Sequence, residues 1–86
     1  MTYAEMIKRQ ILNKEKEDKR KHMYDIQLQF IKDSIKEGRD YVVWIYNDLG
    51  YYHNTVQKTW ANELKEDARR DFESKGFKVR GCVITW

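Results

Sequence analysis

The residues Tyr41-Val42-Val43-Trp44-Ile45-Tyr46 are all β-branched or aromatic. Such a run favours an extended strand, because these side chains pack well on a pleated surface. Since both faces of the run are apolar, it is predicted to lie centrally in a sheet or to be covered on both sides. The turn-forming Asn47-Asp48-Leu49-Gly50 follows. Residues 51–53 are then expected to form either a short second strand or an ordered loop.

Upstream of this strand, the sequence predicts one long helix. Thr2 and Glu5 have the spacing of a capping box, and Gly38 supplies the left-handed residue that commonly ends a helix. No Gly or Pro interrupts the chain between them. The apolar residues of this helix fall into two groups, of which the second is predicted to face the core. The first group is Tyr3, Met6, Ile7, Ile11 and Leu12. The second is Tyr24, Leu28, Ile31 and Ile35, and Met23, Ile26 and Phe30 widen its face to roughly half the helix circumference.

A charged bridge, residues 14–22, separates the two apolar groups and contains no apolar side chain. Its opposite charges have the i,i+4 spacing of helical ion pairs, which favours a solvated continuation of the helix. A break into two helices near Asn13 and a functional basic patch are the alternatives. The patch would bind nucleic acid, although acidic neighbours weaken phosphate binding. Its residues would be Lys14, Lys16, Lys19, Arg20 and Lys21.

Downstream, Asn54 or Thr55 is predicted to cap an amphipathic helix that ends at Gly76. Its apolar stripe repeats every four residues and comprises Val56, Trp60, Leu64, Ala68 and Phe72. Residues 77–86 are predicted to form a strand that reaches the C-terminus. In one sheet with the strand at 41–46, this strand would run parallel to it, through a right-handed crossover.

These elements predict an α+β fold in a single domain over residues 1–86. The long helix covers residues 1–37, and a β-(β)-α-β unit covers residues 41–86. So small a sheet leaves exposed edges, and a hydrophobic strand that ends at Trp86 invites pairing with another chain. The first helix also carries more apolar surface than this sheet can cover. We therefore expect a homodimer, in which a second copy completes the sheet.

Composition excludes several classes of protein. The longest apolar run has six residues, against about 20 for a membrane span, and no apolar signal-peptide region follows Met1. We therefore expect a cytoplasmic protein without membrane contact. The single Cys82 is expected to be buried, and it forms no ligand spacing with His22 or His53. No metal and no cofactor are predicted.

An enzyme is not expected. The only local cluster of reactive residue types is at 48–54, where a turn and a helix cap use the same residues for structural reasons. Tyrosine is enriched in binding hot spots. The predicted partner-binding surface is therefore built from whichever side chains of the aromatic segment point outward, with the alternative that all of them pack on the domain's own helices. These residues are Tyr46, Tyr51, Tyr52 and His53.

The C-terminal pattern consists of Lys75-Gly76-Phe77-Lys78-Val79 and then Val83-Ile84-Thr85-Trp86. Over about the last third of the chain, it resembles small bacteriophage accessory proteins, which end in a helix, a Lys-Gly-Phe/Tyr-x-Val turn and a strand finishing in Ile-x-Trp. The resemblance implies a protein that binds and inhibits a host or defence protein, and it carries over no catalytic residue.

The predicted function is thus a non-enzymatic protein-interaction module, and the resemblance implies a phage-encoded inhibitor or modulator of a host or defence protein. A small nucleic-acid-binding protein that uses the basic residues of 14–22 is the alternative. A sponge for a small nucleotide, held in an aromatic pocket at a dimer interface, is the lower alternative.

Overall fold

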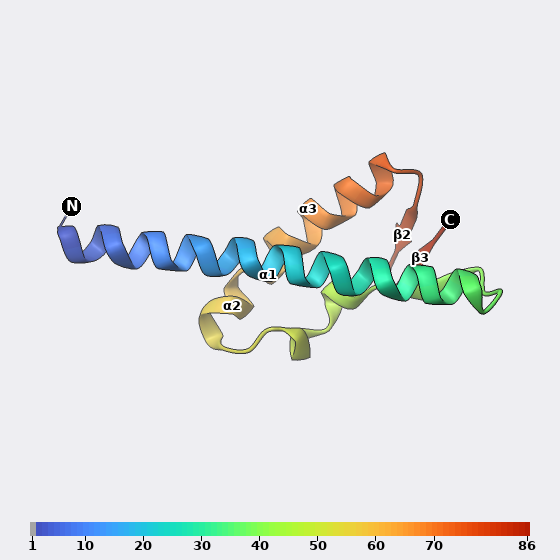
Figure 1. The fold of residues 1–86 in the computed structure, drawn as a ribbon, viewed down its shortest axis with the longest axis horizontal. Coiled ribbons are helices and arrows are strands. Elements are labelled where there is room, and N and C mark those ends of the chain that lie inside the picture. The colour runs from blue at the N-terminus through green and yellow to red at the C-terminus, as the bar shows by residue number, and fades with distance from the viewer. Residues whose placement is uncertain (1) are drawn as a thin grey trace.

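The computed structural model describes residues 2–86 as one long helix beside a small α+β body (Figure 1). Helix α1 runs Tyr3–Lys36 and is followed by strand β1, Tyr41–Val43. Two 3₁₀ turns, η1 (Ile45–Asn47) and η2 (Leu49–Tyr51), lead to helices α2 (Thr55–Thr59) and α3 (Ala61–Ser74). Strands β2 (Lys78–Arg80) and β3 (Val83–Thr85) complete the chain. This content confirms the predicted α+β class.

Helix α1 is continuous, and the break near Asn13 does not occur. Its start is closed by the predicted capping box. The Thr2 hydroxyl accepts a hydrogen bond from the Glu5 amide at 3.2 Å, and the Glu5 carboxylate accepts one from the Thr2 amide at 3.4 Å. At the other end, Gly38 leaves the helix with a φ of 76°, a backbone conformation that disfavours residues with a β-carbon.

The three strands form an antiparallel sheet in the order β1-β3-β2. Because β3 is antiparallel to both neighbours, β1 and β2 run parallel to each other, as a crossover through α3 requires. The two strands do not touch, however, since β3 lies between them. The prediction of a single strand over 77–86 was therefore wrong. A turn at Gly81, with a φ of 59°, folds this segment into a hairpin.

Strand β1 ends three residues earlier than predicted. Gln27 of α1 explains this difference, because its side-chain amide donates to the Val43 carbonyl at 3.1 Å and its side-chain oxygen accepts from the Ile45 amide at 2.9 Å. These bonds satisfy backbone groups that a neighbouring strand would otherwise pair. Trp44, Ile45 and Tyr46 are all buried in one core, which a strand with alternating side chains would not allow.

The remaining differences lie in loops and helix boundaries. Residues 51–53 form no strand, so the ordered loop is the correct alternative. The predicted helix over 54–76 is interrupted at Trp60 and becomes α2 and α3. Cys82 is exposed rather than buried, because it sits in the hairpin turn after Gly81. Its carbonyl accepts a hydrogen bond from the Trp44 amide at 2.8 Å.

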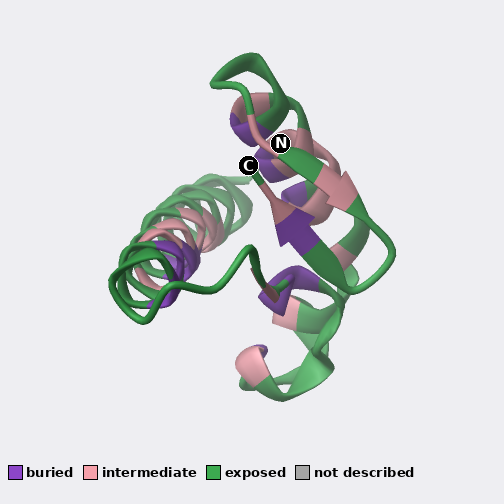
Figure 2. Cartoon of the chain, turned by 90° about the vertical axis from the view of Figure 1, so that its right-hand side faces the viewer, coloured by how far each residue is buried: buried purple, intermediate pink, exposed green. Residues whose placement is uncertain are grey.

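The core lies where α1, η1, α3 and β3 face one another (Figure 2). From α3 it contains the predicted stripe of Leu64, Ala68 and Phe72, with Trp60 at the α2–α3 boundary. The face that α1 buries includes Met23 and Ile31, as predicted, together with the polar Gln27 and Ser34, which bond to the β1 segment. Lys19 is buried as well, whereas the predicted Ile35 is more than half exposed.

Candidate protein-interaction surface

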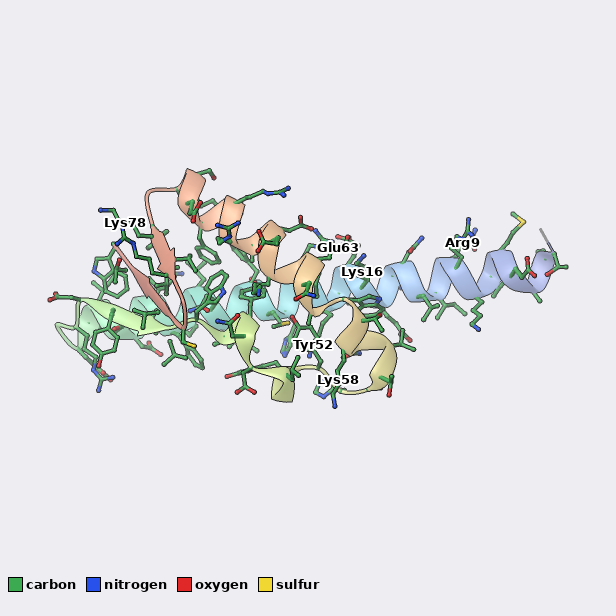
Figure 3. The ribbon with its side chains drawn as sticks, turned by 180° about the vertical axis from the view of Figure 1, so that it is seen from behind. Arg9, Lys16, Tyr52, Lys58, Glu63 and Lys78 are labelled. Atoms are coloured by element: carbon green, nitrogen blue, oxygen red, sulfur yellow. The ribbon has the colours of Figure 1, made fainter. Side chains whose placement is uncertain are left out.

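The first turns of α1 project beyond all the other elements (Figure 1). The molecule measures 54 × 24 × 20 Å. A helix of the length of α1 spans about 51 Å at 1.5 Å per residue, so it accounts for the long dimension. We call residues 3–14 of α1 the arm. In Figure 3, Arg9 lies on this arm, away from the other labelled residues.

The arm leaves the body beside Trp60. Leu12, Asn13 and Lys16 line a shallow hollow together with this indole. Just beyond, Lys16 forms an ion pair with Glu63 of α3 (Figure 3), and Arg20 donates to Asp67 Oδ2 at 2.6 Å. Because both contacts tie α1 to α3, they fix the direction in which the arm projects.

Four large apolar side chains of the arm are exposed to solvent. The exposed fractions are 79% for Tyr3, 46% for Met6, 39% for Ile7 and 54% for Ile11. We call these four residues the apolar stripe. At 3.6 residues per turn, Ile7 lies about 160° around the helix axis from the buried Met23, and Ile11 lies about 160° from Gln27. Ile7 and Ile11 therefore face away from the body and cannot pack on it while α1 stays straight.

The structure divides the predicted aromatic surface into a buried part and an exposed part. Tyr46 and Tyr52 are buried in the core, where Tyr46 packs on Trp44 with a ring-centroid distance of 4.6 Å. Tyr51 is half-buried and His53 is exposed. Of the four predicted residues, only Tyr51 and His53 can therefore present side chains to a partner. Tyr46 and Tyr52 pack inside the domain, as the alternative prediction had it.

Burial also changes the ionisation of these residues. It raises the pKa of Tyr52 to about 12, and it raises the pKa of Tyr46 as well, with smaller contributions from Tyr52 and Tyr24. Burial lowers the pKa of Lys19, whose ammonium lies 5.8 Å from the centroid of the Tyr52 ring. Both tyrosines are shifted away from neutral pH, so neither is tuned for proton transfer there.

The five basic residues predicted to bind nucleic acid do not share one face of α1. Lys16 and Arg20 turn toward the carboxylates of α3, and Lys19 is buried beside Tyr52. Lys14 and Lys21 are exposed, and Lys21 lies at the edge of the space between α1 and α3. The segment therefore presents isolated charges rather than a continuous basic patch.

A groove of about 470 Å³ lies between α1 and α3. Its charged side chains largely neutralise one another. Arg20 pairs with Asp67, and Lys75 donates to Asp71 Oδ2 at 2.9 Å. Lys75 also contacts the Tyr24 hydroxyl. The groove therefore offers few unpaired cations to the phosphate of a nucleotide.

Two further site types were sought over residues 2–86. Within that range, His, Cys, Asp and Glu side chains nowhere gather in a group of three or more that could hold a metal ion. None of the helices described there is both long and apolar enough to cross a membrane.

Sequence reasoning missed Gln27 and the direction of the apolar stripe. Gln27 could have been found from the spacing of Met23, Gln27 and Ile31, which places a glutamine in an apolar line on one helix face. The direction of the stripe follows once that line is known, because all these residues belong to one rigid helix. The spacing of Met23, Gln27 and Ile31 therefore indicated both the buried glutamine and the direction of the apolar stripe.

No protein-family model matches the chain, and no curated protein or solved structure is significantly similar to it. The resemblance of the C-terminal residues to bacteriophage accessory proteins therefore stays a prediction. Function has to be argued from the geometry of the described residues.

Proposed function

We propose that this chain is a non-enzymatic protein-interaction module that binds through the arm of α1. The observation that carries this proposal is the apolar stripe. Each Å² of apolar surface removed from water contributes roughly 25 cal/mol, so four exposed side chains on one helical face favour contact with another apolar surface. Residues at i, i+4 and i+8, here Tyr3, Ile7 and Ile11, are the anchors by which a helix binds along a groove or a second helix.

The distribution of charge supports a protein partner over nucleic acid. Binding to phosphates requires several unpaired Lys or Arg on one surface. Of the candidate residues, Lys16 and Arg20 are instead paired within the body. The arm places Tyr3, Ile7 and Ile11 on the outer face.

The resemblance to bacteriophage accessory proteins supports an inhibitory or modulating role toward a host or defence protein. We include a second contact region besides the arm in this proposal. Tyr51 and His53, the accessible part of the predicted aromatic surface, are our candidate for it.

Photo-crosslinking tests the contact through the arm. A benzophenone amino acid introduced at Ile7, on the stripe, should form a covalent adduct with a polypeptide in cells that express the chain. The matched control places it at Arg9, an exposed position of the same arm on another face. A second change, Ile11→Lys, should suppress the adduct from position 7. Equal adducts from both positions, or none from either, would contradict the proposal.

A further inference from the structure

The outer face of α1 continues beyond the arm as one regular seam. Successive positions of this seam are separated alternately by three and four residues. This is the heptad spacing of helices that pair along their length. The positions are Ala4, Ile7, Ile11, Lys14, Asp18, Lys21, Asp25, Leu28, Lys32 and Ile35. All of them are exposed except Leu28, which is half-buried. We call this set the outer seam.

The outer seam is complementary to itself when it is reversed. In an antiparallel pair of helices with a two-fold axis between residues 19 and 20, position n faces position 39 − n of the other helix. This arrangement places every seam position opposite another seam position. The pairs are Ala4–Ile35, Ile7–Lys32, Ile11–Leu28, Lys14–Asp25 and Asp18–Lys21.

The central pairs join opposite charges, and the outer pairs join mainly apolar side chains. By symmetry, Lys14–Asp25 and Asp18–Lys21 each occur twice, so four ion pairs would lie in the middle of the helix pair. A parallel pair would instead place Lys14, Asp18, Lys21 and Asp25 each opposite its own copy. Four like-charge contacts would then oppose association. The charge order therefore favours the antiparallel direction.

These four charged side chains are free to pair with another chain. Among the ion pairs within residues 2–86, none includes Lys14, Asp18, Lys21 or Asp25. Lys16 and Arg20, which lie between them in sequence, are paired with carboxylates of the body. The charged bridge thus contains two kinds of residue. Lys16 and Arg20 form ion pairs with α3, whereas Lys14, Asp18 and Lys21 form none within residues 2–86.

We infer that the partner of the arm is a second copy of this chain, bound antiparallel along the outer seam. This inference rests on the proposed function and names its partner. Ile7 and Ile11 of each helix lie against the 28–35 half of the other. The two bodies lie on opposite sides of the helix pair, because the seam faces away from Met23 and Gln27.

Charge reversal tests the pairing. Lys14→Glu or Asp25→Lys alone places like charges together at two symmetric contacts, and each should weaken dimerisation about tenfold or more in sedimentation equilibrium. The double variant Lys14→Glu/Asp25→Lys restores opposite charges and should recover most of the native affinity. Circular dichroism checks that the variants fold. A parallel dimer would show no such recovery, and native protein that stays monomeric at the highest soluble concentration would overturn the inference.

Disulfide trapping tests the register independently. In a Cys82→Ser background, Ile11→Cys combined with Leu28→Cys should give a covalent dimer on oxidation. Ile11→Cys alone should not, because the two copies of residue 11 lie about 25 Å apart along an antiparallel pair, at 1.5 Å per residue. Dimers linked through residue 11 alone would contradict the antiparallel register.

The two proposals fail in different ways. A monomeric protein whose Ile7 position crosslinks to another polypeptide would remove the second copy as the partner and leave the interaction module standing. Loss of every stripe-specific adduct would remove both.

Discussion

The two halves of α1 belong to one uninterrupted helix and have opposite relations to the rest of the molecule. In the half that packs on the body, Ile31 is 2% exposed, whereas Ile11 in the arm remains more than half exposed. Both are isoleucines within the same helix, so helix propensity does not distinguish them. The difference is the presence of neighbours, since β1 and η1 pack against the second half of α1 and the arm extends beyond them.

Hydrogen bonds to the β1 segment select the face of α1 that is buried. Gln27 bonds to Val43 and Ile45, and the Ser34 hydroxyl donates to the Tyr41 carbonyl at 2.5 Å. Within residues 2–86, the side chains of the arm form only the capping bonds. Helical structure is therefore a local property here, whereas burial depends on contacts with other elements, such as the bond from Ser34 to Tyr41 and the bonds from Gln27 to Val43 and Ile45.

The largest expected difference is between two isoleucine-to-alanine substitutions, one in each half of α1. Ile31→Ala should lower the free energy of unfolding by about 2–5 kcal/mol, because it leaves a cavity in the core. Ile11→Ala should change it by less than about 0.5 kcal/mol when the protein is dilute enough to be monomeric. Urea unfolding followed by circular dichroism measures both. Similar losses for the two variants would show that the arm packs on the body.

Separate substitutions of Gln27 and Gln29 test the same contrast between buried and exposed positions of α1. Gln27→Leu should cost about 2–4 kcal/mol, because it leaves the Val43 carbonyl and the Ile45 amide without their partner in a buried site. Gln29→Leu removes only an exposed bond to Asp33 and should cost less than about 0.5 kcal/mol. The measurement is again urea unfolding. A neutral Gln27→Leu would mean that other groups can satisfy this part of β1.

Alkaline pH should destabilise the body through its buried tyrosines. The unfolded chain releases the Tyr52 proton near pH 10, whereas the folded chain holds it up to about pH 12. The contribution of Tyr52 to stability is therefore complete below pH 10. It falls by up to about 1.4 kcal/mol per pH unit between these values. Tyr46, whose pKa is raised as well, adds to the loss in the same direction.

Tyr52→Phe isolates this contribution. Its hydroxyl has no hydrogen-bond partner within residues 2–86, so the substitution should be nearly neutral at pH 7. It should also make stability fall less steeply above pH 10. Urea unfolding over a pH series gives both values. An unchanged slope would mean that Tyr52 ionises as readily in the folded chain as in the unfolded one.

The smallest and most local effect concerns the two helix caps. Thr2 caps the arm, and Asn54 caps α2 by accepting from the Gln57 amide at 2.8 Å. Asn54→Ala should lower global stability by about 1 kcal/mol. Thr2→Ala should weaken its helix end by a similar amount but leave the global unfolding transition unchanged. Its effect should appear as faster hydrogen exchange at the Glu5 amide.

A global loss from Thr2→Ala of the same size as that from Asn54→Ala would contradict the independence of the arm. It would mean that fraying of the first turn propagates into the body. The contrast between the two caps is thus a test of where cooperative unfolding begins along α1.

Local signals predicted the helices well. The capping box at Thr2 and the glycine at position 38 bracket α1, and the apolar repeat from Leu64 to Phe72 identifies the buried face of α3. These signals act within one or two turns of a helix, so they can be read without knowing what lies nearby. Strand β1 was overestimated because Trp44-Ile45-Tyr46 has a strand-like composition, and its bonds to Gln27 come from another element.

The candidate site was only partly predictable. The sequence marked Tyr3, Met6, Ile7 and Ile11 as apolar, but the expected partner surface was assigned to the aromatic turn. Two of those aromatics, Tyr46 and Tyr52, are buried because η1 and η2 fold them inward. Their hydroxyl groups made them plausible surface residues from composition alone.

By itself, the sequence determined that α1 is one long capped helix, that an α+β body follows it and that residues 14–22 mix charges of both signs. Capping, propensity and charge order are set by residues a few positions apart. Only the tertiary structure decided which face of α1 is buried and which charges remain free. Those outcomes depend on contacts between distant segments, such as Lys16 with Glu63 and Gln27 with Val43, and no local pattern specifies them.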